Sequence, residues 1–540
     1  MNFDIIDIVI VAFYLLLIFG LGLKYTYSQT SSTEYFLGGR DFGWIMVAIS
    51  LFATNISSEH IVGLAGNGYQ NSIGVLNFEL IGGLSCVLLS WTFGRYYIRN
   101  HIFTLPEYIE KRFNYFCRFY LSVGSIFAYI LTKISIMLLA GAIFLEKIAG
   151  IDVYTSSICL VIITGIYTVS GGFSSVVYTS AAQGIILIIG GSLLTFLSVA
   201  KVGGFEALIS QIPTNNLHLL ENIDSSGFPW TGVLFGIPIL TIWYHCSDQF
   251  MVQKFLVAKN LPNAQAGSVG SAYLKFLPFF LFIIPGIAAK ILYPTIKADD
   301  AYATLILELL PTGLRGIVIA AFLAALMSSL SSAFASCSTL FTLDIYKKIY
   351  PNANDFMIVN VGRIMTFIIV ILAIIWVIFI KSLTGSLYIF LQSVTAYIAP
   401  PITAIFITAI LWSKANEKGA SSGLIVGFLL GAMRFLVEIL IDKKIITEGI
   451  FYQLGTVHFL HFAIFLFIST ITIIVSVSAV TGIPSSEKVN GLTYKYSHLG
   501  NDVDLTVENQ GSTLMRRLTL WGSIVFIIIV LSIYLFLQTR

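Results

Sequence analysis

The chain has 540 residues, of which 57% are hydrophobic and only 11% charged, with a mean hydropathy of +0.89. This apolar content exceeds that of soluble domains and predicts a polytopic membrane protein that lies in a lipid bilayer. A nucleic-acid partner, a disulfide framework and a zinc site are not expected, because the basic residues are scattered through short loops and the five cysteines lack metal-ligand spacing.

Fourteen apolar runs of membrane-spanning length follow one another along the chain. They cover residues 5–23, 42–68, 74–97, 117–146, 153–170, 176–200, 229–250, 268–293, 314–340, 357–380, 385–412, 420–441, 452–481 and 517–537. The first run follows Asp4 and contains Asp7, unlike a signal peptide, so we expect it to remain as a span. Basic residues fall in alternate loops, which predicts that these loops face the cytoplasm of a cell-membrane protein and that both termini lie outside.

Polar residues interrupt the second run at 53–60, and Glu79 lies inside the third. Polar or irregular backbone persists at bilayer depth only where it lines a cavity or is covered by protein. An ionisable residue within a span indicates a functional site by default. The alternative is that the Ser and Asn side chains only bridge helices, or that the helix ends outside the membrane.

The second half of the chain contains a similar polar interruption followed by an ionisable residue. Polar residues at 243–249 interrupt the run that begins near Trp230, and the next span carries Lys275. If spans two to six and seven to eleven are inverted repeats, Glu79 and Lys275 occupy corresponding spans, and paired interrupted segments are typical of a transporter's central site. Coincidence among many spans is the alternative. A capped amphipathic segment at 104–113 predicts a short helix on the inner membrane surface.

Six motifs follow one another along the chain: SLFATNISSEHIVGLAG, NFEL, IWYHCSDQFMVQK, SAYLKFLP, AALMSSLSSAFASCSTLFTLDIY and YIFLQSVTAYIAPP. Together they resemble the sodium:solute symporter family, most closely its sodium/glucose and bacterial sodium/galactose cotransporters. The resemblance implies an all-α fold of the leucine-transporter type with five-plus-five inverted repeats. It places an extra span at 1–24, the first repeat at 42–200, an outer loop and the second repeat at 201–412, and three further spans with a polar inner loop at 413–540.

The same resemblance implies a sodium site. Its ligands would be the carbonyls of Ala53, Ile56 and Ala325 and the hydroxyls of Ser328 and Ser329. Sodium is a hard cation that prefers oxygen ligands, and positions i, i+3 and i+4 share one helical face. Serine pairs in membrane helices, taken alone, more often bond neighbouring helices.

A sugar site is implied as well, with mixed donors and acceptors and an aromatic face. The matching residues are Asn55, His60, Glu79, Thr241, Tyr244, Lys275 and Gln392. Leu64, Phe78 and Tyr388 match the family's outer hydrophobic gate, and Tyr244 is its gate tyrosine. The alternative for His60 and for each gate residue is that the side chain only packs in the protein core.

Three residues depart from the family's pattern. His245 stands where sugar members usually have Trp, Lys254 stands for an Arg, and Ser180 stands for an Asp. In two-sodium members the second ion lies near positions matching Ser331 and Ser332, with a carboxylate at position 180. The missing carboxylate predicts one sodium per sugar. The alternative is that Ser180 changes only an internal hydrogen bond.

These features predict a symporter, not an enzyme, that moves a neutral glucose- or galactose-like monosaccharide together with sodium by alternating access. The alternatives are the same fold carrying myo-inositol, sialic acid, proline or pantothenate, or a channel or solute sensor. A carboxylated solute would need a free cation, whereas Lys275 has Glu79 as an expected partner. No phosphate-binding loop of an ATP-driven pump is present in the sequence.

Overall fold

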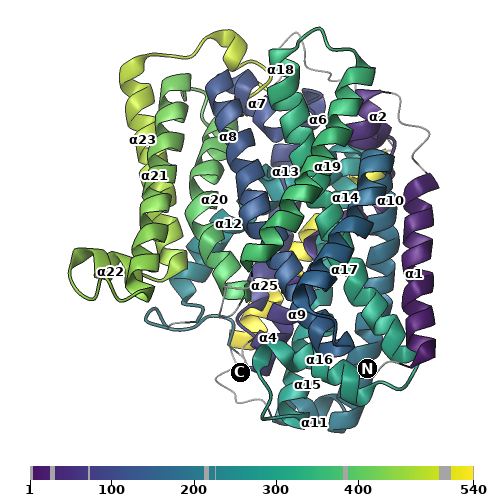
Figure 1. Ribbon diagram of the computed structural model, residues 1–540. Helices are drawn as coiled ribbons and strands as arrows, with labels where there is room; N and C mark the ends of the chain where they lie inside the picture. The colour runs from purple at the N-terminus through teal and green to yellow at the C-terminus, as the bar shows by residue number, and fades with distance from the viewer. Residues whose placement is uncertain are drawn as a thin grey trace.

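The computed structural model describes residues 4–24, 31–70, 73–211, 218–225, 227–380, 387–497 and 513–538. The regular secondary structure of this part of the chain is helical, with two isolated β-bridges besides, and most of its helices stand side by side in one bundle (Figure 1). Helices suit a membrane protein because every backbone polar group within them finds a partner in its own segment.

The first half of the chain forms eleven of the labelled helices. They are α1 (Ile5–Lys24), α2 (Ser32–Leu37), α3 (Trp44–Asn55), α4 (Ser58–Tyr69), α5 (Leu76–Leu88), α6 (Gly94–Arg99), α7 (Leu105–Arg112), α8 (Tyr115–Ala128), α9 (Ser135–Ala149), α10 (Val153–Val202) and α11 (Phe205–Ser210).

The second half forms the remaining helices. They are α12 (Ile237–Ile242), α13 (Gln249–Leu256), α14 (Leu261–Leu274), α15 (Ile284–Leu292), α16 (Ala301–Leu309), α17 (Leu314–Leu340), α18 (Lys347–Ile349), α19 (Asp355–Ile380), α20 (Leu387–Leu411), α21 (Glu417–Asp442), α22 (Ile450–Thr456), α23 (Phe459–Thr481) and α25 (Thr513–Gln538).

Eleven helical segments in the described ranges are long and apolar enough to cross a membrane, and the bent pair α3–α4 would make twelve. The expected fourteen spans exceed this count for two reasons. The sequence divides α10 into two spans, and the run at 229–250 forms only a short apolar helix, Gly232–Ser247. A straight helix of 50 residues, the length of α10, would be about 75 Å long, more than twice the bilayer core. Gly172 leaves helical geometry (φ 56°, ψ −158°), so α10 bends between the two runs that the sequence separates. Fourteen spans stay a prediction.

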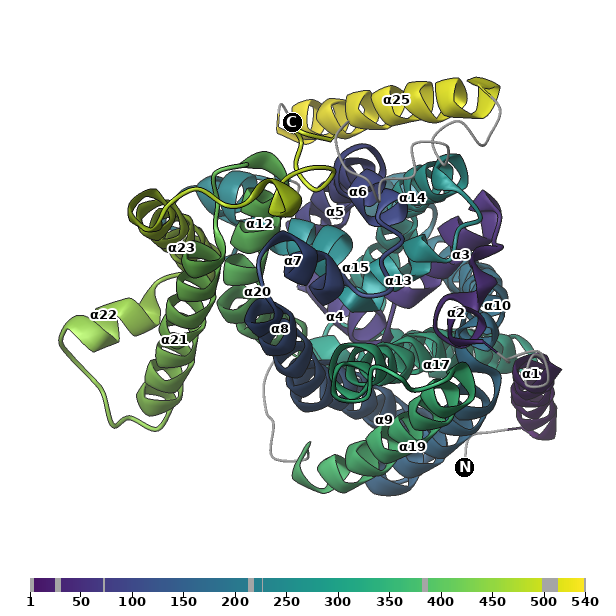
Figure 2. The same cartoon turned by 90° about the horizontal axis from the view of Figure 1, so that it is seen from above.

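The middle of the bundle is built around α17 and the broken helices. In the most apolar window of the segment Leu314–Ile349, 94% of the residues are buried inside the protein. Figure 2 shows α3, α4, α13 and α14 grouped beside α17, while α21–α23 project to one side and α25 lies across another. Broken helices surrounded by other helices are positioned to line an internal site.

The predicted short helix at 104–113 is confirmed as α7, and its place on the inner membrane surface stays a prediction. The Thr104 hydroxyl caps it by accepting a hydrogen bond from the backbone N–H of Glu107 at 3.2 Å. In Figure 1, α6, α7 and α18 lie at one end of the bundle and both chain ends lie at the other. The basic residues of α7 and α18 therefore share one end, as their loop pattern predicts.

Candidate functional site

The helix break between α3 and α4 is the centre of the site. Ile56 and Ser57 have extended backbone, and the two helices meet at 63°. The Ser58 hydroxyl joins the start of α4 to α9, because it donates to the Met137 carbonyl at 2.7 Å. Short polar side chains compete with helical backbone bonding, so the break falls where the sequence is polar.

The serine face of α17 packs directly against this break. The Ser329 hydroxyl lies 3.1 Å from the carbonyl oxygens of both Thr54 and Ile56. The Ser328 hydroxyl is fully buried and has no hydrogen-bond partner among the described residues. Ala53 and Ala325 are buried as well. The carbonyl end of a helix carries a partial negative charge, so these oxygens can receive a small cation.

A cavity beside the break brings the expected solute ligands together. All seven of them line it, and they come from α3, α4, α5, the α12–α13 segment, the end of α14 and α20: Asn55, His60, Glu79, Thr241, Tyr244, Lys275 and Gln392. The structure thus assembles one site from six segments that are up to 337 residues apart (392 − 55).

The Lys275 ammonium organises the polar side of this cavity. It lies 3.0 Å from Glu79 Oε2 and 2.8 Å from Asn55 Oδ1, and all three side chains are buried. Lys275 can reach them because α14 ends at Leu274 and the chain turns before Pro278, which cannot continue the helical bonding. Gly82 on α5 lies beside the same groups: a Cβ there would be 3.1 Å from the His245 ring, which is tight, and 3.4 Å from the Lys275 nitrogen, which is an ordinary contact.

Two buried polar atoms of the lining have no partner among the described residues: Asn55 Nδ2 and His245 Nε2. Asn55 Oδ1 accepts from Lys275, which leaves the amide nitrogen as a free donor. His245 Nδ1 lies 3.0 Å from the Thr241 carbonyl, which can only accept, so Nδ1 is the donor and Nε2 of the neutral ring is an acceptor. Buried polar atoms are normally satisfied, so the pair indicates a polar ligand.

A second buried ion pair reaches the cavity through its lysine, Lys133, which the sequence analysis did not predict. Lys133, in the π-helical turn between α8 and α9, pairs with Asp248, which also accepts from the Tyr129 hydroxyl. The Lys133 nitrogen lies over the rings of Phe250 and Tyr244, 4.2 Å and 4.7 Å from their centroids. The rule that identified Glu79 and Lys275, an ionisable residue inside an apolar run, would have found Lys133 too.

The expected gate residues differ in their positions. Phe78 and Tyr244 line the cavity. Leu64 is fully buried on α4 and is not one of the lining residues. The side chain of Tyr388 lies outside the described residues.

Two of the three departures from the family's pattern are in contact. The buried Lys254 amine lies 3.1 Å from the Ser180 hydroxyl and 3.1 Å from the Val176 carbonyl. A lysine thus donates to position 180, where a carboxylate was expected from the family. Ser331 and Ser332 both donate to the Ser328 carbonyl at 2.9 Å.

The cavity is balanced in charge. Its two lysines, Lys133 and Lys275, are paired with Asp248 and Glu79. A cation that already has a carboxylate partner gains less from an anionic ligand, so the arrangement favours a neutral solute with several hydrogen-bonding groups.

Known membrane transport proteins resemble this chain in sequence. The sequence model of the sodium:solute symporter family matches residues 35–427. The chain is 38% identical to the sodium/myo-inositol cotransporter 2 of Mus musculus, over 91% of this chain and 79% of that protein. It is also 38% identical to the sodium/glucose cotransporter 1 of Oryctolagus cuniculus, over 88% of this chain and 79% of that protein.

Solved structures share the fold. A Na+-coupled sialic acid symporter in a substrate-bound outward-open state superposes with a TM-score of 0.76 at 20% identity, covering 89% of this chain and 99% of that one. A transporter of the nucleobase-cation-symport-1 family superposes with a TM-score of 0.55 at 13% identity, covering 85% and 97%.

Proposed function

Since the chain belongs to the sodium:solute symporter family, we propose that its solute is a neutral ring that carries several hydroxyl groups. The chain is a multi-pass membrane transporter and not an enzyme, and sodium is the co-transported ion. Two classes of solute fit the proposal. The sugar-site motifs favour a glucose- or galactose-like monosaccharide. The similarity to the sodium/myo-inositol cotransporter 2 favours a cyclitol such as myo-inositol.

The observation that carries the proposal is the buried Glu79–Lys275–Asn55 cluster beside an unpaired donor and an unpaired acceptor. A hydroxyl group has one donor, so it can accept from Asn55 Nδ2 while it donates to either Glu79 or His245 Nε2. Two hydroxyl groups on one solute would satisfy all three without changing the charge of the site. Tyr244 supplies an aromatic face in the same cavity. A carboxylated solute would have to compete with Glu79 for Lys275.

The break between α3 and α4 is shared by the proposed sodium and solute sites, which explains how binding of the two could be coupled. Asn55 and His60, which line the solute cavity, flank Ile56, whose carbonyl contacts the serine face of α17. We propose that sodium bound by Ala53, Ile56, Ala325, Ser328 and Ser329 holds the break in the geometry that the solute needs. Binding of one ligand then favours binding of the other by the same free energy.

Solute binding to the purified protein tests this proposal. Binding of myo-inositol, galactose, glucose, proline and sialic acid would be measured by calorimetry in sodium and in choline buffer. We expect a polyol or sugar to bind in sodium only. Sodium-dependent binding of proline or sialic acid, with no sugar or cyclitol binding, would refute the proposed solute class.

Removing two hydroxyl ligands is expected to change the sodium dependence. The double variant Ser328→Ala with Ser329→Ala should raise the sodium concentration for half-maximal uptake about tenfold or more, since each lost bond to a charged group is worth about 1.5–3 kcal/mol. The apparent solute affinity at saturating sodium should change much less. Ser338→Ala is the matched control, because its buried hydroxyl on α17 donates to Gly362 of α19 instead. Unchanged sodium dependence in the double variant would exclude this sodium site.

We expect one sodium ion per solute. A second cation at an assumed separation of roughly 8 Å from the first would be repelled by about 2 kcal/mol at an effective dielectric constant near 20. Position 180 has no carboxylate to offset this repulsion, and Lys254 already donates to the Ser180 hydroxyl. The measurement is the reversal potential of solute-coupled current in proteoliposomes at set gradients. A value that fits two sodium ions per solute would contradict the expectation.

A further inference from the structure

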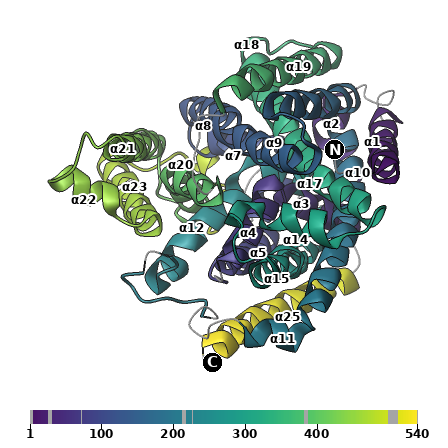
Figure 3. The ribbon, with the colours of Figure 1, turned by 60° about the horizontal axis from the view of Figure 1, so that its bottom comes forward.

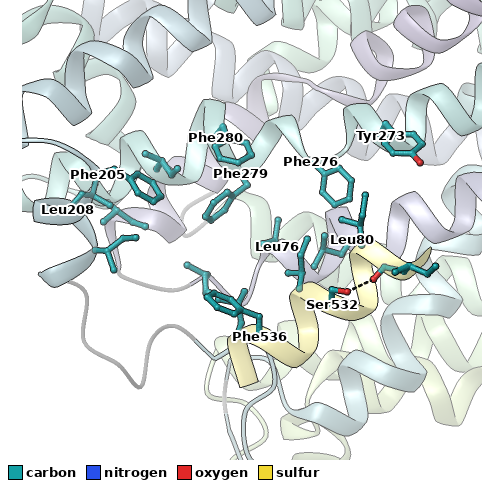
Figure 4. Close-up of a pocket in the computed structure, with 18 residues that line it drawn as sticks. Leu76, Leu80, Phe205, Leu208, Tyr273, Phe276, Phe279, Phe280, Ser532 and Phe536 are labelled. Carbon is teal, nitrogen blue, oxygen red and sulfur yellow. Dashed lines mark hydrogen bonds between the residues drawn. The ribbon is translucent and has the colours of Figure 1, made fainter. Parts of the chain in front are cut away.

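An apolar groove lies between α25 and the helices that carry the Glu79–Lys275 pair (Figure 4). Its volume is about 770 Å³. The walls come from α5, α11, the segment from Tyr273 to Ile287 and α25, and Figure 3 shows α11, α15 and α25 close together at this end of the bundle. Leu80 and Leu208 in its lining are almost fully buried, whereas Phe205, Phe280 and Phe536 are about half exposed.

The lining of the groove is suited to a hydrocarbon ligand, because none of its described residues offers a free polar group. Ser532 and Tyr273 are the two polar side chains of the groove. The Ser532 hydroxyl donates to the Ile528 carbonyl in its own helix at 2.8 Å, and the Tyr273 hydroxyl donates to the Gly522 carbonyl at 2.7 Å. Both hydroxyls therefore have partners, and an apolar space without free polar groups does not hold water.

The groove is continuous with the surface that faces the bilayer. Only 17% of the most apolar window of α25 is buried in the protein, and Ile528 beside the groove is 56% exposed. Phospholipid acyl chains are the apolar groups that the bilayer supplies along this whole surface. We propose that the groove is a binding site for an acyl chain of a membrane phospholipid.

This position places the bound chain directly behind the solute site. Leu76 and Leu80 lie three residues before and one residue after Glu79 on α5, and Phe276 follows Lys275. On its other side the groove is closed by α25, which is fixed to α5: the Tyr534 hydroxyl donates to Asn77 Oδ1 at 2.6 Å. The acyl chain thus packs against both helices whose ends hold the ion pair.

Photolabelling tests the site without knowledge of the solute. The full-length protein would be placed in phosphatidylcholine vesicles that contain a phosphatidylcholine with a diazirine in its acyl chain, and labelled peptides would be identified by mass spectrometry. Ser532→Trp fills the groove. Leu531→Trp is the control, because Leu531 is 57% exposed on the same helix but does not line the groove. Ser532→Phe replaces the first variant if that one does not fold.

We expect labels on residues 276–287 and 528–537. They should fall about tenfold in Ser532→Trp, because loss of contact with a few methylene groups accounts for such a ratio of occupancies. Labelling in Leu531→Trp should be unchanged. Equal labelling of Ser532→Trp and the unchanged protein would overturn the proposal, and so would a sterol or a second protein retained in the groove in place of phospholipid.

Discussion

Replacing Lys275 or Glu79 by alanine is expected to abolish solute uptake, while each variant still inserts into the membrane. The two groups are 3.0 Å apart and buried, so removal of one takes away the ion-pair partner of the other. Breaking a buried pair costs about 3–5 kcal/mol in stability, and the charge that remains changes the geometry that the solute needs. The variant also loses hydrogen bonds to the solute. Uptake of labelled solute into proteoliposomes is the measurement.

The control is a lysine that is paired but exposed. Lys147 lies 3.0 Å from Asp300, and its side chain is 45% exposed. Exposed pairs contribute about 0–1 kcal/mol, so Lys147→Ala should transport almost normally. Near-normal uptake by a folded Lys275→Ala or Glu79→Ala variant would show that the pair is not part of the solute site.

The Lys133–Asp248 pair is expected to show strong energetic coupling. Lys133→Met or Asp248→Asn alone leaves one buried charge without its partner, which should destabilise the protein by about 3–5 kcal/mol. The double variant removes both charges, so it should be clearly more stable than the sum of the single effects indicates. Thermal unfolding of all four proteins in detergent gives the coupling. Both single variants should also transport poorly, because Lys133 and the neighbouring Tyr244 line the cavity.

Two outcomes separate this account from its alternative. Single effects that add to within about 0.5 kcal/mol would show that the two side chains are independent. Normal uptake by the double variant would show that the pair stabilises the fold only, and that it has no part in transport.

The sequence predicted which polar residues lie together better than it predicted the number of helices. Glu79 and Lys275 are detectable because an ionisable residue in an apolar run is rare, and the structure places them together in a cavity. Polar interruptions at 53–60 and 243–249 likewise fall on real breaks in α3–α4 and α12–α13. The division of the chain into two inverted repeats stays a prediction.

Other features depend on three-dimensional contacts that periodicity does not encode. The contact between Lys254 and Ser180 joins two departures that the sequence showed only as separate substitutions. The continuation of α10 through Gly172 could not be predicted, because a glycine between two apolar runs is compatible with a loop or a bend. The free atoms Asn55 Nδ2 and His245 Nε2 become apparent only when all partners are placed.

Sodium-driven uptake is the most direct test of the central claim, that a neutral polyhydroxylated solute moves together with sodium. Proteoliposomes would be loaded with potassium and given labelled myo-inositol, galactose, glucose, proline or sialic acid, with and without an inward sodium gradient. The account predicts accumulation of a sugar or cyclitol above its external concentration only when the sodium gradient is present. Equal uptake of that solute without the gradient, or gradient-driven accumulation of a carboxylated solute alone, would contradict it.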